Sequence, residues 1–370
     1  MKSKPGKNKW AGKEVISVDI GENRTKVVVG KQERNGVRLS QAFSFTTPRY
    51  AYEKGQIIGF EELKKALQEQ LSERKVKAKA AFASVESADI ITREIAVPQA
   101  KPEELEKLLQ FEIQQYMPIE LSQYVVQYKA IEEFEEEGVN KVRVLVTAMP
   151  RELARTYYEL LESCGLDAAV LDIQSNAVDK LFCCDQKVNG GNGFRSQSVA
   201  VLDLGHRHIN VVVLENGQFK FNRFLNHGAW DINVNISHGT GIEPEETEVL
   251  KLNIPTLRKG GLFDDRGVAP EERDATKEQA LELTRRTVDG WVEDIERVIK
   301  YYTTRSTGNV LERIYVYGGV VEMNGFPEYL QESLNIPVEK IESLSGVNFG
   351  KAGEGPITDY INAFGTLMRR

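Results

Sequence analysis

An internal repeat constrains the fold of this chain more than any other feature of its sequence. In each copy an apolar run ends in an aspartate, one apolar residue and a glycine; the copies are residues 15–21 and 199–205. Asp19 aligns with Asp203, and Gly21 aligns with Gly205. Because self-similarity within a chain indicates repeated structural units, the sequence predicts two related halves.

Both copies continue with a second apolar run, an Asn-Gly pair and a third alternating segment. These are residues 27–29, 35–36 and 37–45 in the first copy, and 211–213, 216–217 and 218–225 in the second. Apolar runs rich in β-branched residues are typical of strands, and Asn-Gly between them is a strong hairpin signal. We therefore expect three consecutive antiparallel strands at the start of each half. Helix-like and strand-like segments then alternate, as in 61–73 and 78–85, which favours an α/β fold with a mixed sheet.

The repeated Asp-x-Gly turn suits a phosphate ligand. Glycine lets the backbone approach a ligand closely, and the N–H groups of such a turn can face a phosphate. Two such turns across a cleft would hold a polyphosphate from both sides, and the carboxylates of Asp19 and Asp203 would hold a hydrated Mg²⁺. Single Asp-x-Gly turns are common, so the alternative of two unrelated hairpins stays open, although the matched flanking strands favour a shared site.

Composition excludes several other classes of protein. The chain has 370 residues, of which 41% are hydrophobic and 28% charged, and this favours two to four compact units. A net charge of −7 argues against a general nucleic-acid binder. The three cysteines, two of them adjacent, are typical of a reducing compartment. No apolar run approaches the roughly 18 residues of a membrane span, so we expect a soluble, cytoplasmic chain.

Three segments in order, Asp19–Lys26, Asp203–Gly205 and Tyr315–Gly325, resemble the phosphate-1, phosphate-2 and adenosine motifs of the actin/Hsp70/sugar-kinase superfamily. Three further segments are similar to the PilM family of type IV pilus assembly proteins, relatives of the cell-division protein FtsA. They are Arg93–Pro98 with the helix-like stretch after it, Glu328–Leu330 and Asp359–Arg369. The resemblance runs from about residue 14 to the C-terminus. It implies duplicated ribonuclease-H-like halves with an inserted FtsA/PilM-type subdomain.

The resemblance assigns roles in binding ATP and Mg²⁺ to particular residues. Asp19 and Asp203 would organise the metal ion, while Gly21 and Gly205 would admit the phosphates. Lys26, seven residues after Asp19, matches a phosphate-contacting lysine.

On the adenosine side, Gly318 and Gly319 would lie against the nucleoside. Glu248 and Lys251 match an E-x-x-K that borders the ribose and adenine in relatives; from the residues alone they are equally an (i, i+3) charge pair on a helix.

Hydrolysis depends on Gln174, which matches the position of a polar residue near the attacking water in actin-like ATPases. A glutamine orients water but is a poor base, so we expect at most a slow ATPase. The other interpretation of Gln174 is a residue that only caps a helix. The phosphate motifs also depart from the usual pattern, since Glu22 follows Gly21 and the bulky run His206–His208 follows Gly205. Binding is therefore favoured over hydrolysis.

The predicted organisation has five parts. They are a basic disordered tail (1–13, with contact to anionic lipid as an alternative), a first half 1A (14–87 and 163–190), an inserted subdomain 1C (88–162), a second half 2A (197–230 and 311–370) and an outer subdomain 2B (231–310). Subdomain 1C reads as strand, helix, strand, acidic loop at 132–138, strand and helix. Residues 259–278 read as an exposed loop.

The family resemblance implies partners as well as a ligand. In the PilM family a groove beside the inserted subdomain receives the cytoplasmic N-terminal segment of the membrane protein PilN. The chain would then be a nucleotide-dependent scaffold of the pilus platform and its motor, held at the inner face of the cytoplasmic membrane through partners. Three alternatives remain: a small-molecule kinase of the same fold, a filament former or membrane tether like FtsA, and a nucleotide-free adaptor whose ATP site has decayed.

Overall fold

The computed structural model describes residues 10, 12–33, 36–117, 119–183, 186–191, 193–244, 246–258, 275–305 and 309–369. The chain divides into two compact units, Met1–Lys180 with Asn362–Arg370, and Leu181–Ile361. None of the described helices is long and apolar enough to cross a bilayer.

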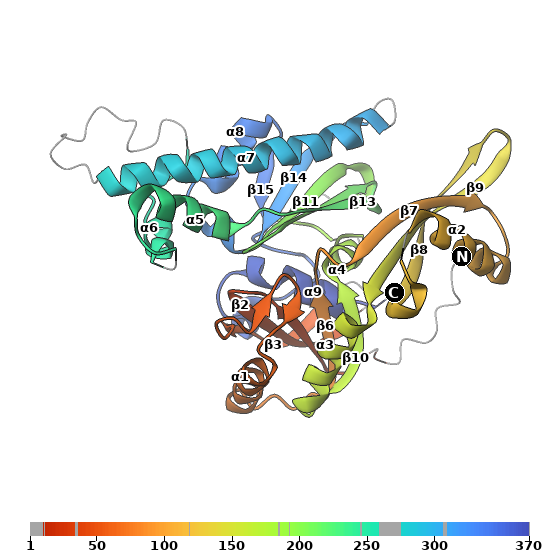
Figure 1. The fold of residues 1–370 in the computed structure, drawn as a ribbon, viewed down its shortest axis with the longest axis horizontal. Helices are drawn as coiled ribbons and strands as arrows, with labels where there is room; N and C mark the ends of the chain where they lie inside the picture. The colour runs from red at the N-terminus through yellow and green to blue at the C-terminus, as the bar shows by residue number, and fades with distance from the viewer. Residues whose placement is uncertain are drawn as a thin grey trace. The chain divides into compact units, whose positions relative to one another are not determined.

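The first unit is built on a five-stranded mixed sheet with the order β10-β6-β1-β2-β3 (Figure 1). Its strands are β1 (Val15–Ile20), β2 (Arg24–Glu33), β3 (Gly36–Thr46), β6 (Ala80–Val85) and β10 (Asp167–Ile173). β1, β2 and β3 form an antiparallel meander, while β6 runs parallel to β1 and β10 parallel to β6. Every residue of β1 and β6 is buried, as expected for strands that are covered on both faces.

The second unit repeats this sheet strand for strand, in the order β13-β12-β11-β14-β15. Its strands are β11 (Ser198–Leu204), β12 (Ile209–Glu215), β13 (Gln218–Leu225), β14 (Arg313–Tyr317) and β15 (Val338–Lys340). The antiparallel and parallel pairs occur at the same places as in the first unit. The predicted duplication, with three antiparallel strands at the start of each half, is confirmed.

The hairpin turn predicted at Asn216 and Gly217 is present between β12 and β13. Asn216 and Gly217 both have positive φ angles, 53° and 71°, as a two-residue hairpin turn requires. The matching Asn35 of the first copy lies outside the described residues.

Amphipathic helices complete the core of each unit. In the first unit they are α1 (Phe60–Glu73), α3 (Arg151–Ser163) and α4 (Gln174–Phe182), and a two-residue hairpin β4 (Tyr52–Glu53) and β5 (Gln56–Ile57) precedes α1. α1 buries Leu63, Leu67 and Leu71, spaced at one helical turn, in the same core as β1 and β6. Burying each leucine side chain contributes about 1.5–3 kcal/mol to the free energy of unfolding.

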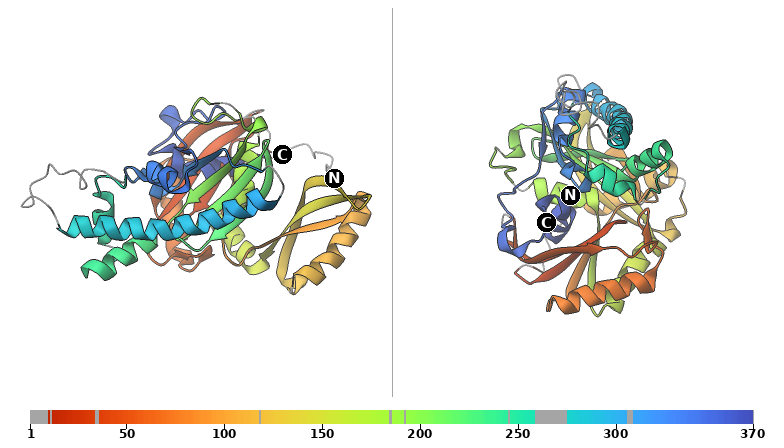
Figure 2. Two further views of the ribbon diagram at one scale, coloured as in Figure 1. Left: turned by 90° about the horizontal axis from the view of Figure 1, so that it is seen from above. Right: turned by 90° about the vertical axis from the view of Figure 1, so that its left-hand side faces the viewer.

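In the second unit the 31-residue helix α7 (Ala275–Arg305) runs along one face of the sheet (Figures 1 and 2). The other helices of this unit are α5 (Ala229–Thr240), α6 (Thr247–Leu252) and α8 (Phe326–Leu334). The short 3-10 helices are η1 (Leu121–Gln123) in the first unit and, in the second unit, η2 (Phe194–Ser196), η4 (Gly319–Glu322), η5 (Gly350–Ala352) and η6 (Ile357–Tyr360).

The inserted segment of the first unit forms a separate three-stranded sheet with the order β7-β9-β8. Its elements are β7 (Ile91–Pro98), α2 (Pro102–Tyr116), β8 (Tyr124–Glu136) and β9 (Val139–Pro150). α2 covers one face through Leu105, Leu109 and Ile113, which share a core with Val144 and Val146 of β9 (Figure 2). The other face lacks this helix.

One expectation about the insertion is wrong. The acidic run predicted as a loop at 132–138 belongs mostly to β8, and the turn is only Glu137–Gly138. Both turn residues have positive φ, 53° and 76°, so two residues suffice and the strands continue to the turn. Ion pairs such as Lys141–Glu136 at 2.6 Å then join the two strands.

The ends of the predicted segments also differ from the structure. Residues 275–278 were expected in a loop at 259–278, but they belong to α7, which begins at Ala275; residues 259–274 and most of the basic tail lie outside the described residues. The C-terminal stretch from Asn362 was expected in the second half, but it groups with the first unit. In α9 (Ile361–Leu367) a Cβ on Gly365 would lie 2.1 Å from the carbonyl oxygen of Ala177, so α9 packs directly on α4. The finer division into 1A, 1C, 2A and 2B stays a prediction.

Candidate functional site

The turn after β1 is a close-packed backbone loop. The N–H of Gly21 donates to the carbonyl oxygen of Arg24 at 3.2 Å, and a Cβ added to Gly21 would lie 2.9 Å from that oxygen. Thr47 braces the loop, since its hydroxyl donates to the carbonyl of Gly21 at 2.7 Å. Close approach, not a positive φ, therefore requires glycine here. The same hypothetical Cβ would lie 3.2 Å from Nζ of Lys26, so the predicted phosphate-contacting ammonium is directed at this turn.

Asp19 is buried at the end of β1, with 2% of its surface exposed. Its Oδ1 accepts hydrogen bonds from Ser84 Oγ at 2.9 Å and from Gln174 Nε2 at 3.0 Å. Lys26 is its cross-strand neighbour on β2. Both hydrogen-bond donors are neutral, and no described cation forms an ion pair with this carboxylate. Buried carboxylates are usually paired or bound to a metal ion. The carboxylate of Asp19, with only neutral hydrogen-bond donors around it, therefore fits a ligand of a divalent cation.

The second unit contains the same turn after β11. The N–H of Gly205 donates to the carbonyl oxygen of His208 at 3.0 Å, and a Cβ on Gly205 would lie 2.9 Å from that oxygen. Asp203 is 6% exposed and occupies the same place on its strand as Asp19 does on β1. Each turn thus has an equivalent backbone hydrogen bond, an equivalent close approach that excludes a Cβ, and an aspartate at the equivalent position.

Gly318 brings a third predicted segment against Asp203. Its φ is +99°, and a Cβ there would lie 2.5 Å from the carbonyl oxygen of Leu204 and 3.0 Å from Oδ1 of Asp203. Its N–H donates to the carbonyl of Thr358. By contrast, a Cβ on Gly319, the first residue of η4, would meet no atom within 4 Å. Protein packing therefore requires Gly318 but not Gly319.

Glu248 and Lys251 form the predicted charge pair on α6. Lys251 Nζ donates to Glu248 Oε2 at 2.5 Å, and Asn233 Nδ2 donates to the same oxygen at 2.9 Å. Burial raises the pKa of Glu248, but Lys251, Asn233 and the nearby His206 oppose it, and the net result is a pKa below the usual value. Burial lowers the pKa of Lys251 despite the attraction of Glu248. Since His206 belongs to the turn after β11, the pair lies near that turn.

The bulky residues of the turn after β11 are held by aromatic side chains. His208 stacks on Phe224 with ring centroids 5.1 Å apart, and the guanidinium of Arg207 lies 4.6 Å from the ring of Trp230. In the first unit, Oε1 of Glu22 accepts the N–H of Lys54 at 2.7 Å, so this carboxylate is bonded to the β4–β5 turn. The departures from the family pattern thus have partners within the protein.

A groove of about 450 Å³ lies in the first unit, beside the face of the inserted sheet that α2 does not cover. It is lined by β8 and β9 of that sheet and by residues of α3, β10 and α4; they are Val125, Gln127, Tyr128, Lys129, Leu145, Thr147, Met149, Ala154, Leu171, Asp172, Ile173 and Asn176. β8 and β10 are both edge strands. Its walls are mainly apolar, with the charged groups of Lys129 and Asp172 among them.

Several of these residues were not found from the sequence. Ser84 lies in a strand that reads as continuously apolar, and only its pairing with Asp19 in the parallel ladder gives it a role. Thr47 and the groove residues come from segments far apart in the chain. A lone serine within a buried apolar strand was the only available signal.

Comparison with known proteins decides the family. A sequence profile described as Type IV pilus assembly protein PilM matches residues 17–257, more than half of the chain. The chain belongs to the PilM family. The family predicted from the sequence is therefore confirmed, and the protein is an actin-like member of the type IV pilus assembly proteins.

Solved structures support the same fold. A PilM-PilN type IV pilus biogenesis complex has a TM-score of 0.74 at 18% identity, covering 96% of this chain and 97% of that one. The ethanolamine utilization protein EutJ from Carboxydothermus hydrogenoformans has a TM-score of 0.54 at 13% identity, covering 95% and 88%. MreB5 of Spiroplasma citri, bound to ADP, has a TM-score of 0.50 at 13% identity, covering 95% and 94%. At these identities the likeness shows the actin-like fold, which confirms the predicted fold class.

Proposed function

We propose that this PilM-family protein binds Mg·ATP through its two Asp-x-Gly turns and binds the cytoplasmic N-terminal segment of PilN in the groove beside the inserted sheet. It would act as a nucleotide-dependent scaffold at the inner face of the cytoplasmic membrane, attached through its partners. The observation that carries the proposal is the duplicated turn, in which both glycines make the same hydrogen bond and have the same steric limit of 2.9 Å.

Each residue has a role in this proposal that follows from its surroundings. Gly21 and Gly205 keep the backbone open to the phosphates, and Lys26 supplies a compact positive charge directed at the first turn. Asp19 and Asp203 would hold Mg²⁺, which usually keeps several waters and takes few carboxylates. A bound Mg²⁺ would neutralise phosphate charge. Gly318 and Gly319 would lie against the adenosine, with Glu248 and Lys251 beside the ribose.

Gln174 supports binding more than rapid turnover. Its amide nitrogen donates to Asp19, which orients the side chain, and 6% of the residue is exposed. An amide cannot accept a proton from water at neutral pH, so it can position a water molecule but not activate it as a base. Hydrolysis should be slow at most.

The groove suits an extended peptide. It combines apolar side chains with two edge strands, and a peptide in such a place gains affinity from main-chain hydrogen bonds and from pockets for alternate side chains. The similarity to a PilM-PilN complex supports PilN as the partner.

Helix α4 connects the two proposed sites within the first unit. Gln174 at its start contacts Asp19, and Asp179, five residues later, forms an ion pair with Lys129 in the wall of the groove. Lys180 pairs with Asp172, and Asn176 Nδ2 donates to Asp172 Oδ1 at 2.8 Å. A shift of Asp19 and Gln174 on nucleotide binding would therefore be transmitted to charged groups that line the groove.

The nucleotide proposal is tested by calorimetry with Mg·ATP. Asp19→Asn and Asp203→Asn keep the shape of each side chain but remove its charge, and each should abolish measurable binding. Asp167→Asn, an exposed aspartate of β10 in the first unit, is the matched control and should bind like the wild type. Unchanged ATP affinity in both Asp19 and Asp203 variants would defeat the assignment and favour a nucleotide-free adaptor.

The partner proposal is tested separately with a synthetic peptide of the PilN cytoplasmic N-terminus. Thr147→Arg places a long side chain in the groove and should weaken peptide binding at least tenfold, whereas Glu135→Arg on the exposed part of β8 should not. Equal affinity of the wild type and Thr147→Arg would place the peptide elsewhere.

A further inference from the structure

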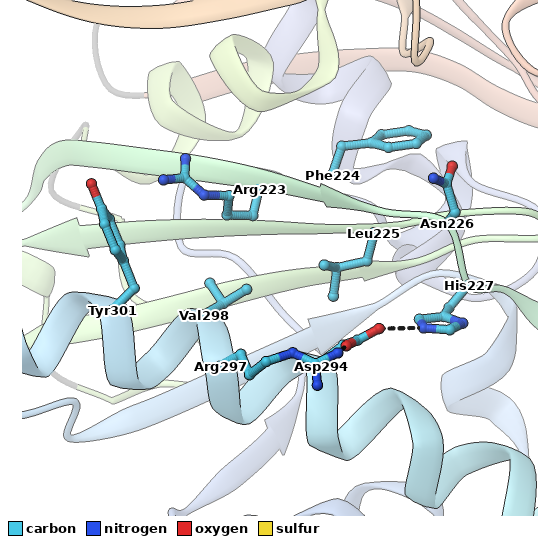
Figure 3. Close-up of a pocket in the computed structure, with 9 residues that line it drawn as sticks. All are labelled: Arg223, Phe224, Leu225, Asn226, His227, Asp294, Arg297, Val298 and Tyr301. Carbon is cyan, nitrogen blue, oxygen red and sulfur yellow. Dashed lines mark hydrogen bonds and ion pairs between the residues drawn. The ribbon is translucent and has the colours of Figure 1, made fainter.

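A second concave site lies in the other unit, between the end of β13 and helix α7. Its volume is about 580 Å³. Figure 3 shows the residues that line it, which come from β13, from the two residues after this strand and from one side of α7. They are Arg223, Phe224, Leu225, Asn226, His227, Asp294, Arg297, Val298 and Tyr301. None of them is assigned to nucleotide binding or lines the groove, although Phe224 stacks on His208 of the turn after β11.

β13 offers this site a strand edge. It is the last strand of the order β13-β12-β11-β14-β15, and no described strand pairs with its outer side. Such an edge presents backbone N–H and C=O groups that can pair with another extended chain. The site therefore has the main-chain groups that strand addition needs.

Arg223 supplies a fixed positive charge at this edge. Its guanidinium lies 5.1 Å from the ring of Phe221 and 4.8 Å from the ring of Tyr301, and it donates to the neighbouring carbonyl of Asn222 at 2.9 Å. No carboxylate among the described residues forms an ion pair with it, although the whole chain carries a net charge of −7. Aromatic packing holds the side chain in place, so its charge is available to an anionic ligand.

The acidic group in the site is already occupied. Asp294 accepts from His227 Nε2 at 2.5 Å and also forms an ion pair with Arg297 (Figure 3). His227 lies in addition 3.5 Å from the carboxylate of Asp231. Asp294 therefore does not cancel the charge of Arg223, and the site stays attractive to acidic side chains.

The spacing of the cations favours an extended ligand. On α7, Arg297, Tyr301 and Arg305 are four residues apart and share one side of the helix, and Arg305 lies 5.9 Å from the ring of Tyr301. Eight helical residues span about 12 Å, and about four residues of extended chain cover this length. Side chains at positions i and i+4 of a strand point to the same side, so a strand along this helix would present its side chains at the same spacing.

From these observations we propose that the edge of β13 and the adjoining side of α7 bind an extended acidic peptide segment of a partner protein by strand addition. Glutamate or aspartate side chains at alternate positions would face α7 and the charge of Arg223. Because successive side chains of a strand point to opposite faces, the side chains between them would lie on the other face of the sheet, the side of Phe224 (Figure 3). This proposal does not depend on ATP or PilN binding.

The test uses the full chain and three fluorescein-labelled nine-residue peptides in a fluorescence anisotropy titration. The first alternates glutamate and valine, the second alternates lysine and valine, and the third is the glutamate peptide with alternate amides N-methylated. The glutamate peptide should bind, and the other two should bind at least tenfold more weakly. Strong binding by the lysine peptide, or no binding by the glutamate peptide, would overturn the proposal.

Variants then locate the site. Arg223→Glu should weaken the glutamate peptide at least tenfold, and Arg223→Lys should weaken it less, because the charge stays while the stacked guanidinium is lost. Arg286→Glu makes the same charge change on α7 outside this site and should bind like the wild type. Equal affinity of Arg223→Glu and Arg286→Glu refutes the location. Self-association of the wild type that Arg223→Glu abolishes would identify the occupant as a second copy of the chain and also refute a partner peptide.

Discussion

The two adjacent glycines at the proposed adenosine site, Gly318 and Gly319, differ in whether the fold requires glycine. Gly318 has a φ of +99°, and a Cβ there would clash with the backbone of Leu204, whereas a Cβ on Gly319 would meet no atom within 4 Å. The first glycine is needed for the fold itself. No described protein atom requires the second, so the proposed adenosine site is the reason we give for it.

Alanine at these two positions should therefore separate stability from binding. Gly318→Ala should cost at least about 2 kcal/mol of unfolding free energy, because it combines an unfavourable φ with a steric clash. Gly319→Ala should change the unfolding free energy by less than about 0.5 kcal/mol but weaken Mg·ATP binding. Urea denaturation and calorimetry measure the two quantities. Normal ATP affinity in Gly319→Ala would remove this residue from the proposed site.

The Glu248–Lys251 pair should make stability depend on pH in the acidic range. The folded pKa of Glu248 is below its usual value of 4.5, so its contribution is fully present above that pH and is lost as the pH falls through the folded pKa. Glu248→Gln should lower the melting temperature at pH 7, and its difference from the wild type should shrink below about pH 4.5. Glu243→Gln, an exposed glutamate before α6, is the control. A difference that stays constant between pH 3.5 and 7 would contradict this explanation.

Among the elements, α4 contacts residues of both proposed sites of the first unit. Its first residue bonds to the buried carboxylate of Asp19, and Asp179 bonds to Lys129 on β8. Since a helix moves largely as a rigid body, a displacement at one end is felt at the other.

Breaking the contact between α4 and β8 should uncouple nucleotide from partner. Asp179→Asn keeps the size of the side chain but removes its charge, and the affinity for the PilN peptide should then no longer differ between apo and Mg·ATP forms. Glu136→Gln, which breaks the exposed pair with Lys141 at the end of β8, should keep the wild-type difference. Peptide titrations with and without Mg·ATP measure this difference in affinity. A wild-type difference in Asp179→Asn would exclude this route.

At the scale of the whole molecule, the proposal requires one nucleotide to contact both units. Hydrogen exchange can test this, because a ligand that binds only the folded form protects the backbone it contacts. Mg·ATP should slow exchange in the turns at 20–25 and 204–209 of the wild type. Asp19→Asn should lose protection in both turns, including the one in the other unit. Protection of 204–209 that survives in Asp19→Asn would mean that the turns bind independently.

Much of this architecture could be predicted from the sequence because it depends on local patterns. Buried parallel strands require continuous apolar runs, so β1 and β11 were visible with their aspartates and glycines, and their repetition revealed the duplicated fold. Gly21 and Gly205 could be predicted because they recur at the same place after each repeated strand, and the structure shows that both turns need glycine for close backbone approach. The acidic run of β8 misled the local interpretation, because a two-residue turn lets charged strands continue to the end of a hairpin.

Only the tertiary structure could show which distant residues meet. The bond of Ser84 and Gln174 to Asp19, the packing of α9 on α4 and the walls of both concave sites join segments that are far apart in the chain. No local pattern encodes such contacts, because they arise when separate strands and helices pack into one core. Sequence therefore determined the repeated halves and their turns, while packing decided what surrounds each carboxylate and which residues line the two concave sites.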